Sequence, residues 1–405
     1  MNARNKESQT GEKALDFKSR LQALADKGSE GAVAWVDEVI REGIRRGASD
    51  IHIEPAGEEV LVRFRLDGVL HPPVASRTAL AQNVIARVKV LADLLTYQTD
   101  VPQEGRISRD KVGAPADLRA STFPTVHGEK VVIRLFDPAT QDVRLEDLGY
   151  PDELRLSLEH QLVQPTGTIL FTGPAGSGKT TSIYAALRFI LEQARGERNI
   201  VSVEDPVERA LAGVSQTQVH PPSGLTFARC LRSLMRQDPE VIVVGEIRDR
   251  ETAEIATEAG LTGHLVLSTI HSGTAPGVFA RLLDMGAQPY LIASSVNFVV
   301  AQRLVRKLCT GCRKPSGERG AGASIAGYAP VGCESCFQTG YRGRTVLAEA
   351  LTMSGDLRQK ILERSPIEAI QAAVAPGMRS LREAAEQAVR DGVTSRAEIR
   401  RVLGG

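Results

Sequence analysis

At 405 residues the chain is long enough for two or three domains that each bury their own core. Apolar residues make up 42% and charged residues 24% of the sequence, a composition that excludes a disordered or fibrous chain. The net charge of +1 provides no overall positive field that would attract nucleic acid or anionic lipid, which leaves only a local basic patch as a possibility.

Targeting signals and cysteine usage both point to the cytoplasm. Charge or Gly interrupts every apolar run well before the roughly 18 residues that a membrane helix needs. The first residues, MNARNKESQTGEKALDFKSR, are polar and contain no signal-peptide core. Four of the five Cys form two close pairs, which favours a reducing compartment and a metal over a disulfide framework. The fifth, Cys230, is expected in the core.

The first third of the chain predicts an α+β domain over residues 29–137, preceded by a polar, disordered tail over residues 1–28. Apolar residues recur at helical spacing in VAWVDEVIREGIRRG, and Gly47 offers a stop. The segment EEVLVRFRLDG alternates as a half-buried strand does. A helical pattern over residues 78–95 precedes two predicted strands, DLRASTFP and KVVIRLFD.

The remainder predicts an α/β domain over residues 151–405, after a linker at 138–150. Its expected strands are GTILFTG, NIVSVEDP, EVIVVGE and HLVLSTI, with a helical stretch between successive strands. The run EVIVVGE is almost wholly apolar, as in a parallel strand covered on both faces. Residues 354–405 predict helices whose capping boxes pair Ser365 with Glu368, Ser380 with Glu383 and Ser395 with Glu398, and Pro366 is expected as a first helical residue.

The segment GPAGSGKT predicts a phosphate-binding loop, because it matches G-x-x-x-x-G-K-[ST] between a strand and a helix. Its glycines let backbone N–H groups turn toward phosphate oxygens at a helix N-terminus. Lys179 would reach the β and γ phosphates, and Thr180 would hold Mg²⁺ through its hydroxyl. A Gly-rich turn without ligand is the alternative. The predicted nucleotide-binding residues here are Gly173, Pro174, Ala175, Gly176, Ser177, Gly178, Lys179, Thr180 and Thr181.

Two acids and two histidines follow or bracket strands of the same predicted sheet. Glu246 ends VIVVGE and Glu204 ends IVSVE, which are positions for an acid that acts on the metal or on the attacking water. Each acid could instead cap the following turn. His264 and His271 bracket LVLSTI, where we predict γ-phosphate sensing or a structural role.

Four cysteines in two C-x-x-C pairs predict a structural zinc site. Cys309 and Cys312 are separated by twenty residues from Cys333 and Cys336, within a loop-rich element at about 305–340. Four protein ligands leave no open position for water, so the metal would staple the loop. A disulfide pair and an iron–sulfur cluster are the competing interpretations.

The motifs together resemble the secretion-superfamily ATPases, in particular the assembly ATPases of type II secretion systems and type IV pili. The resemblance rests on GPAGSGKTTS, VEDPVE, LRSLMRQDPEVIVVGEIRDRETAEIA and TGHLVLSTIHS, together with ASDIHIEP, VRFRLDGVL, VPQEGRIS and DLRASTFPTVHGEKVVIRLF in the N-terminal half. It covers about residues 30 to 400. It implies a RecA-like P-loop core, an N-terminal PAS-like α+β domain, a small zinc knuckle and C-terminal helices.

The resemblance also implies roles for individual residues. Lys179 and Thr180 would bind ATP and Mg²⁺, Glu246 would be the Walker B acid that holds Mg²⁺ through water, and Glu204 would activate the attacking water. Four arginines would gather around the phosphates when the two domains close: Arg119, Arg134, Arg236 and Arg344. Arg forks match phosphate oxygens and stabilise the charge of phosphoryl transfer.

The family assembles as homo-hexamers on an inner-membrane platform protein, so the resemblance implies a peripheral location at the cytoplasmic face of that membrane. Its tetracysteine zinc element favours filament assembly over retraction. The sequence departs from the family in two respects. The polar N-terminal segment of about 30 residues is too short for the further docking domain of type II secretion members. The segments HSGTA and GRTVLAEA also differ from the usual motifs, the second at Val346 and Leu347. The rival hypotheses are a nucleic-acid translocase and a degenerate scaffold. The translocase is disfavoured because aromatic residues make up only 4% of the sequence and basic residues are not in excess. The scaffold is disfavoured because the sequence retains Glu204, Glu246 and Lys179.

Overall fold

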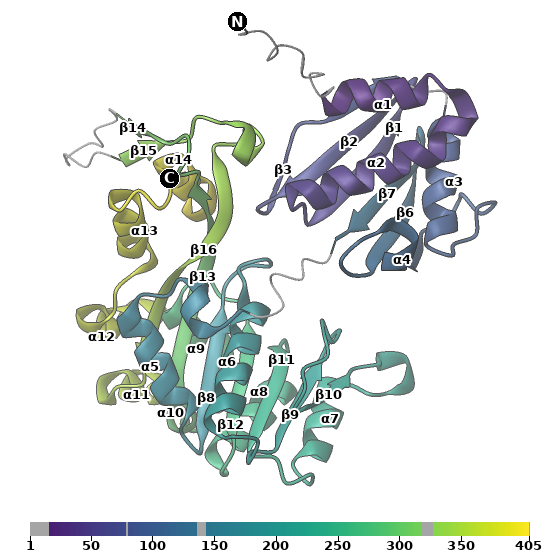
Figure 1. Cartoon of the computed structure of the whole chain (residues 1–405). Helices are drawn as coiled ribbons and strands as arrows, with labels where there is room; N and C mark the ends of the chain where they lie inside the picture. Colours follow the sequence, from purple (N-terminus) through teal and green to yellow (C-terminus); the bar gives the residue numbers. More distant parts are fainter. Residues whose placement is uncertain (1–15, 78–79, 136–142, 317–326, 405) are drawn as a thin grey trace, which may run out of the picture. The chain divides into compact units, whose positions relative to one another are not determined.

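The computed structural model separates into two compact units, with the boundary between Gln141 and Asp142 (Figure 1). This boundary falls within the range 138–150 that the sequence predicts as a linker. The residues whose structure is described are 16–77, 80–135, 143–316 and 327–404. Among these residues, no helix has both the length and the apolar character needed to cross a bilayer.

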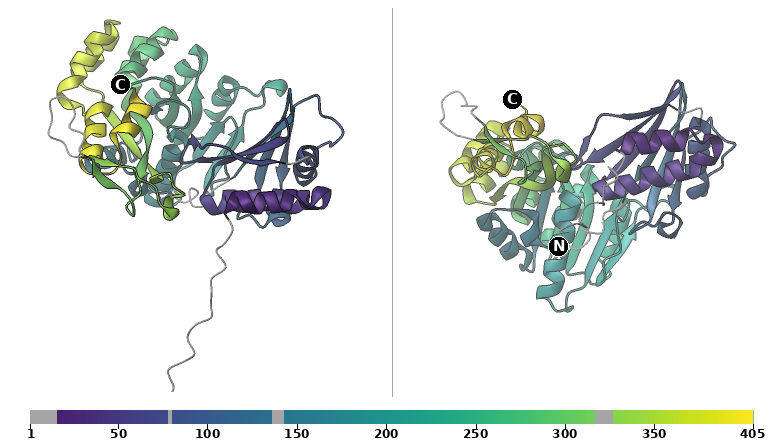
Figure 2. Two further views of the ribbon diagram at one scale, coloured as in Figure 1. Left: turned by 90° about the horizontal axis from the view of Figure 1, so that it is seen from above. Right: turned by 45° about the horizontal axis from the view of Figure 1, so that its top comes forward.

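The N-terminal unit is an antiparallel sheet with helices on one face. Its strands run in the order β3-β2-β1-β7-β6-β5, and β4 pairs with β2. Helices α1, α2 and α3 share one core with the sheet and cover one of its faces (Figures 1 and 2). The bounds are α1 Phe17–Ala25, α2 Gly31–Arg46, β1 Asp50–Ala56, β2 Glu59–Leu66, β3 Val69–Leu70, β4 Val74–Arg77, α3 Ala81–Leu91, β5 Gln103–Ile107, α4 Arg109–Val112, β6 Leu118–Thr125 and β7 Gly128–Arg134.

The predicted elements of this unit form, and its beginning differs from the prediction. Helix α2 ends at Gly47 in the left-handed conformation, and β2 buries every second residue. Residues 17–25, which we predicted as part of a disordered tail, form α1 instead. Phe17 and Leu21 are buried on the sheet, and Asp16 caps the helix by accepting the N–H of Ser19. The apolar stripe of α1 is short, and the helix is stable only because it packs against the tertiary core.

The C-terminal unit is a seven-stranded sheet in the order β10-β9-β11-β12-β8-β13-β16. The four predicted strands, β9, β11, β12 and β8, pair in parallel and are almost completely buried, so this part of the prediction is confirmed. The bounds are α5 Asp152–Leu162, β8 Gly167–Thr172, α6 Lys179–Gln193, β9 Ile200–Glu204, β10 Val214–Gln218, α7 Phe227–Leu234, β11 Val241–Ile247, α8 Arg250–Leu261, β12 Leu265–Ile270, α9 Ala275–Asp284 and α10 Pro289–Ser295.

Two long strands extend the sheet beyond what the sequence predicts. Strand β13, Val296–Leu308, runs parallel to β8, and β16, Tyr341–Thr352, pairs antiparallel with β13. Figure 1 shows this pair continuing from the sheet toward the small hairpin of β14, Lys314–Ser316, and β15, Gly327–Ala329. Their outer halves carry polar and charged residues, which hide the strand signal that apolar alternation would give.

Four helices complete the chain, and their caps differ in part from the prediction. Ser380 and Glu383 form the predicted capping box. Pro366 is itself the N-cap of its helix, so the box predicted from Ser365 is wrong. Ser395 caps the last helix, but the Glu398 side chain points elsewhere, as described below. The bounds are α11 Gly355–Leu362, α12 Ile367–Val374, α13 Leu381–Arg390 and α14 Arg396–Leu403.

Candidate nucleotide site and cysteine cluster

The predicted phosphate loop connects the carboxyl end of β8 to the first turn of α6, which begins at Lys179. Gly173 has φ = 142°, and a Cβ placed there would lie 2.4 Å from the carbonyl oxygen of Gln302. Only Gly fits this backbone, because an L side chain is strained at that φ and would collide with β13. Thr180 is exposed on the first turn of α6. The loop therefore has the backbone and position that the motif predicts.

Lys179 folds back over its own loop. Its Nζ donates to the carbonyl oxygens of Gly173, at 2.9 Å, and Pro174, at 3.1 Å. Burial lowers the pKa of this ammonium, Glu246 opposes that effect and Arg303 adds to it. These two neutral carbonyl oxygens accept the hydrogen bonds of the Lys179 ammonium group. A charged phosphate oxygen would form a stronger hydrogen bond with the same group.

Two neighbouring side chains of β13 lie next to the loop, and no sequence motif marks either residue. The buried Gln302 donates its Nε2 to the Ser177 carbonyl at 2.8 Å and accepts the Tyr150 hydroxyl at 2.9 Å. Arg303 donates to the Gly273 carbonyl at 2.7 Å. Gln302 lies 125 positions from Ser177 and 152 from Tyr150, and Arg303 lies 30 from Gly273, so no local pattern predicts these contacts.

Glu246 lies at the same edge of the sheet, on an irregular stretch of β11. The β11–β12 register shifts between Val244 and Ile247, and β12 hydroxyls donate to the carbonyls of Val244 and Gly245. The Glu246 carboxylate forms an ion pair with Arg248, and its Oε2 lies 3.6 Å from Nε2 of His271. The structure thus brings together Lys179, Glu246 and His271, and adds Arg248.

Glu204 ends the neighbouring strand β9, with its carboxylate held by three donors. These are Ser202 Oγ at 2.6 Å, Tyr184 Oη at 2.6 Å and Gln216 Nε2 at 3.0 Å. Burial and the adjacent Glu204 raise the pKa of Tyr184, so its hydroxyl stays a donor. A carboxylate offers about four acceptor positions, so one remains for a water molecule.

Two predicted site residues lie at the edge of the sheet opposite the phosphate loop. His264 precedes β12, and its Nδ1 lies 3.1 Å from the Ala259 carbonyl. Arg236 follows α7 and precedes β11, beside Asn199, which binds the carbonyl of Gln237. Parallel strands of six or seven residues separate both side chains from the phosphate loop of this chain by about 20 Å. Arg344 is exposed on β16, opposite Arg306.

In the N-terminal unit, Arg119 of β6 and Arg134 of β7 are direct cross-strand neighbours. Both are exposed on the sheet face that lies opposite the core, because the residues next to them, such as Ile133, point inward. The Asp50 carboxylate pairs with Arg134 at 3.2 Å and with Arg65 at 3.4 Å. Two adjacent guanidinium groups on one face form a positive site that suits phosphate oxygens.

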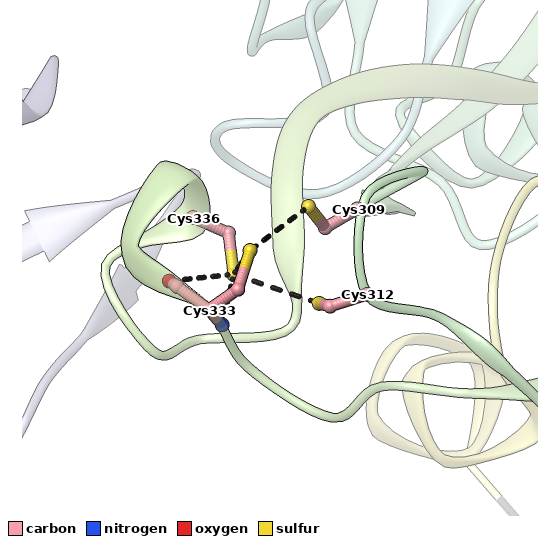
Figure 3. Close-up of side chains that lie close together, drawn as sticks. All are labelled: Cys309, Cys312, Cys333 and Cys336. Atoms are coloured by element: carbon pink, nitrogen blue, oxygen red, sulfur yellow. Dashed lines mark hydrogen bonds between the residues drawn. The ribbon is translucent and has the colours of Figure 1, made fainter.

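The four cysteines of the C-x-x-C pairs meet, as predicted. Figure 3 shows two sulfurs from the turn after β13 facing two from the turn before β16, and all four lie within 4.8 Å of one another. The Sγ–Sγ distances Cys309–Cys333, Cys312–Cys336 and Cys333–Cys336 are 3.8, 3.8 and 3.7 Å. A tetrahedral zinc with bonds of about 2.3 Å requires sulfurs about 3.8 Å apart, so the residues fit this metal.

Hydrogen bonds favour the thiolate at Cys333, whereas burial raises the pKa of the Cys312 thiol to about 11. The Ser335 hydroxyl and a backbone N–H lower the pKa of the Cys333 thiol to about 6. Backbone N–H groups of Gly332 and Gly340 donate to Cys312 and Cys336, each at 3.3 Å. The four thiols are free rather than joined in disulfides.

Comparison with known proteins agrees with this site. A profile of the family described as Type II/IV secretion system protein matches residues 25–401. The chain belongs to this family. This secretion ATPase is 45% identical over 371 residues to the type II secretion system protein HxcR of Pseudomonas aeruginosa, covering 91% of the chain and 77% of that protein. It is 43% identical over 379 residues to the type II secretion system ATPase E of Vibrio cholerae, covering 91% and 75%.

A further relative and a solved structure extend the comparison. The type IV pilus assembly ATPase PilB of Myxococcus xanthus is 40% identical over 381 residues, which cover 91% of the secretion ATPase and 67% of PilB. The solved structure of the ATPase DotB of Yersinia pseudotuberculosis superposes with a TM-score of 0.66 at 22% identity, covering 92% and 93% of the two chains. The predicted family, its fold and P-loop ATPase activity are thereby confirmed.

Proposed function

We propose that this secretion ATPase is a hexameric motor that hydrolyses ATP to assemble a pilus or pseudopilus for protein secretion. The observation that carries the proposal is the meeting of Lys179, Glu246 and His271 at one sheet edge, in a chain whose relatives are secretion and pilus assembly proteins. A phosphate loop with a neighbouring acid is the equipment for hydrolysis at a γ-phosphate.

Each residue of the site has a proposed task. Lys179 leaves the carbonyls of its own loop for the β and γ phosphates, while the loop N–H groups bind the phosphate oxygens. Thr180 would hold Mg²⁺ directly and Glu246 would hold it through water, and a metal bound there would supply charge neutralisation for the phosphates. Glu204 orients and deprotonates the attacking water through its remaining acceptor position. His271, in contact with Glu246, responds to the γ-phosphate.

The mechanical output is closure of the N-terminal unit on the C-terminal unit. Arg119 and Arg134 suit this task because they are adjacent and exposed, and Arg344 would join them at the phosphates. Cations near the phosphates stabilise the closed arrangement most when nucleotide is bound. The nucleotide state would therefore determine whether the two units close. A platform protein in the inner membrane receives the motion, and a peripheral, cytoplasmic location follows from that partner.

The cysteine cluster holds structural zinc in this proposal. Cys309, Cys312, Cys333 and Cys336 supply four ligands and leave no position for a reacting water. A metal held by these four residues would fix the end of the β13–β16 pair, which has little core of its own.

Steady-state ATP turnover tests the proposal. Lys179→Ala and Glu246→Gln should each lower turnover by about two orders of magnitude, whereas Lys360→Ala, on an exposed ion pair with Glu363, should match the unaltered protein. Turnover should also rise with protein concentration as hexamers form. Unchanged turnover in Lys179→Ala would show that the enzyme assignment is wrong.

The partner is tested separately by capture from solubilised membranes with Glu246→Gln protein in the presence of ATP. Recovery of an inner-membrane platform protein supports the motor. Turnover that depends on added single-stranded DNA would instead favour a translocase.

A further inference from the structure

Glu349 is a buried carboxylate that binds the first residues of two helices at once. It lies on β16 opposite Ala301 of β13, with 3% of its surface exposed. Its Oε1 accepts the backbone N–H of Ala275 at 2.7 Å, and its Oε2 accepts that of Leu381 at 2.9 Å. These residues begin α9 and α13, so both oxygens face the positive ends of helix dipoles.

One of these contacts belongs to the segment that carries His271. This segment, residues 271–275, is held at three places along its length, of which the Glu349 contact is one. The Thr172 hydroxyl accepts the Ser272 N–H at 2.8 Å, Arg303 donates to the Gly273 carbonyl, and Glu349 accepts the Ala275 N–H. Since His271 contacts Glu246, these anchors determine where the imidazole stands relative to the Glu246 carboxylate.

The charge of Glu349 is linked to the phosphate site through Arg303. Both side chains lie on the same face of the β13–β16 pair, since Ala301 and Arg303 are two residues apart on one strand and Glu349 is opposite Ala301. Burial lowers the pKa of Arg303 and Glu349 opposes that effect, while Arg303 in turn acts on Lys179. Glu349 therefore balances the charge of Arg303, the cation that lies next to Lys179 of the phosphate loop.

We propose that Glu349 is a positioning residue for ATP hydrolysis, which fixes the His271 segment beside Glu246 by holding Ala275 and facing Arg303. Its second oxygen fastens the C-terminal helix α13 to the same point. Only a carboxylate serves both N–H donors, because the amide of Gln offers one acceptor oxygen and an NH₂ group. The inference rests on the hydrolytic role proposed above for Glu246 and His271.

The test is Glu349→Gln, measured as kcat and KM for ATP together with the number of bound ADP molecules per chain. We expect kcat to fall on the order of tenfold or more, because small displacements of a positioned group cost that much. KM should stay within about twofold, since Lys179 and its loop are untouched. Binding of one ADP per chain would show that the loss is not a loss of folded protein. Hydrogen exchange should rise over residues 272–277.

Glu398→Gln is the matched control, because Glu398 is also a buried carboxylate of this unit that accepts a backbone N–H, that of Arg306. It should leave kcat per bound ADP unchanged. If Glu349→Gln turns over within about twofold of the unaltered protein, or if the control loses as much kcat, the proposal is wrong.

Arg303→Gln provides a second variant, which keeps the proposal testable if Glu349→Gln does not fold. It removes the donor to Gly273 and should also lower kcat. In the double variant the two losses should combine to less than their product, because both act on the same segment. Fully multiplicative losses would contradict the link. Failure of Lys179→Ala to lower turnover would reject the proposed function itself, whereas normal turnover of Glu349→Gln beside an inactive Lys179→Ala rejects only this inference.

Discussion

Replacement of Glu398 by Gln should destabilise the C-terminal unit in a way that depends on pH. The Glu398 carboxylate accepts the N–H and the guanidinium of Arg306 and the guanidinium of Arg401, at 2.6 to 3.0 Å. Burial opposes its ionisation, but the hydrogen bonds from Arg401 and Arg306 outweigh that effect and lower its pKa from 4.5 to about 2.

This pKa difference corresponds to about 3 kcal/mol of folding free energy at neutral pH. Because the folded pKa is depressed, the contribution is fully present above the unfolded pKa of 4.5 and is lost as the pH falls toward 2. The Gln variant lacks this dependence. The difference in unfolding free energy between the two proteins should therefore be about 3 kcal/mol at pH 7 and shrink steadily between pH 4.5 and 2.

The assay is urea unfolding followed by circular dichroism at several pH values. The single Trp, Trp35, lies in the core of the N-terminal unit, so its fluorescence reports that unit in the same sample and serves as an internal control. Its transition should not move in Glu398→Gln. A difference between the proteins that is independent of pH from 7 to 2 would refute the electrostatic reasoning.

Three other changes have defined outcomes. In the first, Lys89→Met, Glu129 would stay buried without the Lys89 Nζ that lies 2.6 Å from its Oε1. The unfolding free energy reported by Trp35 fluorescence should fall by about 3 to 5 kcal/mol. An unchanged unfolding midpoint would contradict a structural ion pair. Gly173→Ala should abolish ATP binding measured by calorimetry, because its Cβ would collide with a β13 carbonyl at 2.4 Å, and a normal affinity would show that the loop relaxes freely. Cys336→Ser should remove the stoichiometric zinc measured by metal analysis and should expose the adjacent hairpin to protease. Prolonged chelation should have the same effect on the unaltered protein. Protease resistance in the metal-free protein would show that zinc does not stabilise the fold.

The sequence alone determined the features that depend on local pattern. The strand and glycine spacing around Lys179 predicted the phosphate loop, since a Gly-rich turn before a helix has few other uses. Alternating or continuous apolar runs predicted β2 and the four central parallel strands. The two C-x-x-C pairs predicted the cysteine cluster, because tetrahedral ligation imposes that spacing.

Tertiary structure decided the contacts that join distant segments. His271 and His264 flank the same strand but lie at opposite edges of the sheet. Only His271 lies beside Glu246, whereas His264 lies beside the Ala259 carbonyl. Gln302 and Arg303 reach the phosphate loop only because β13 pairs with β8, and Glu349 reaches two helices only because β16 pairs with β13. Local sequence carries no signal for such pairings, since their stability comes from burial and hydrogen bonds between segments that meet only in the folded chain.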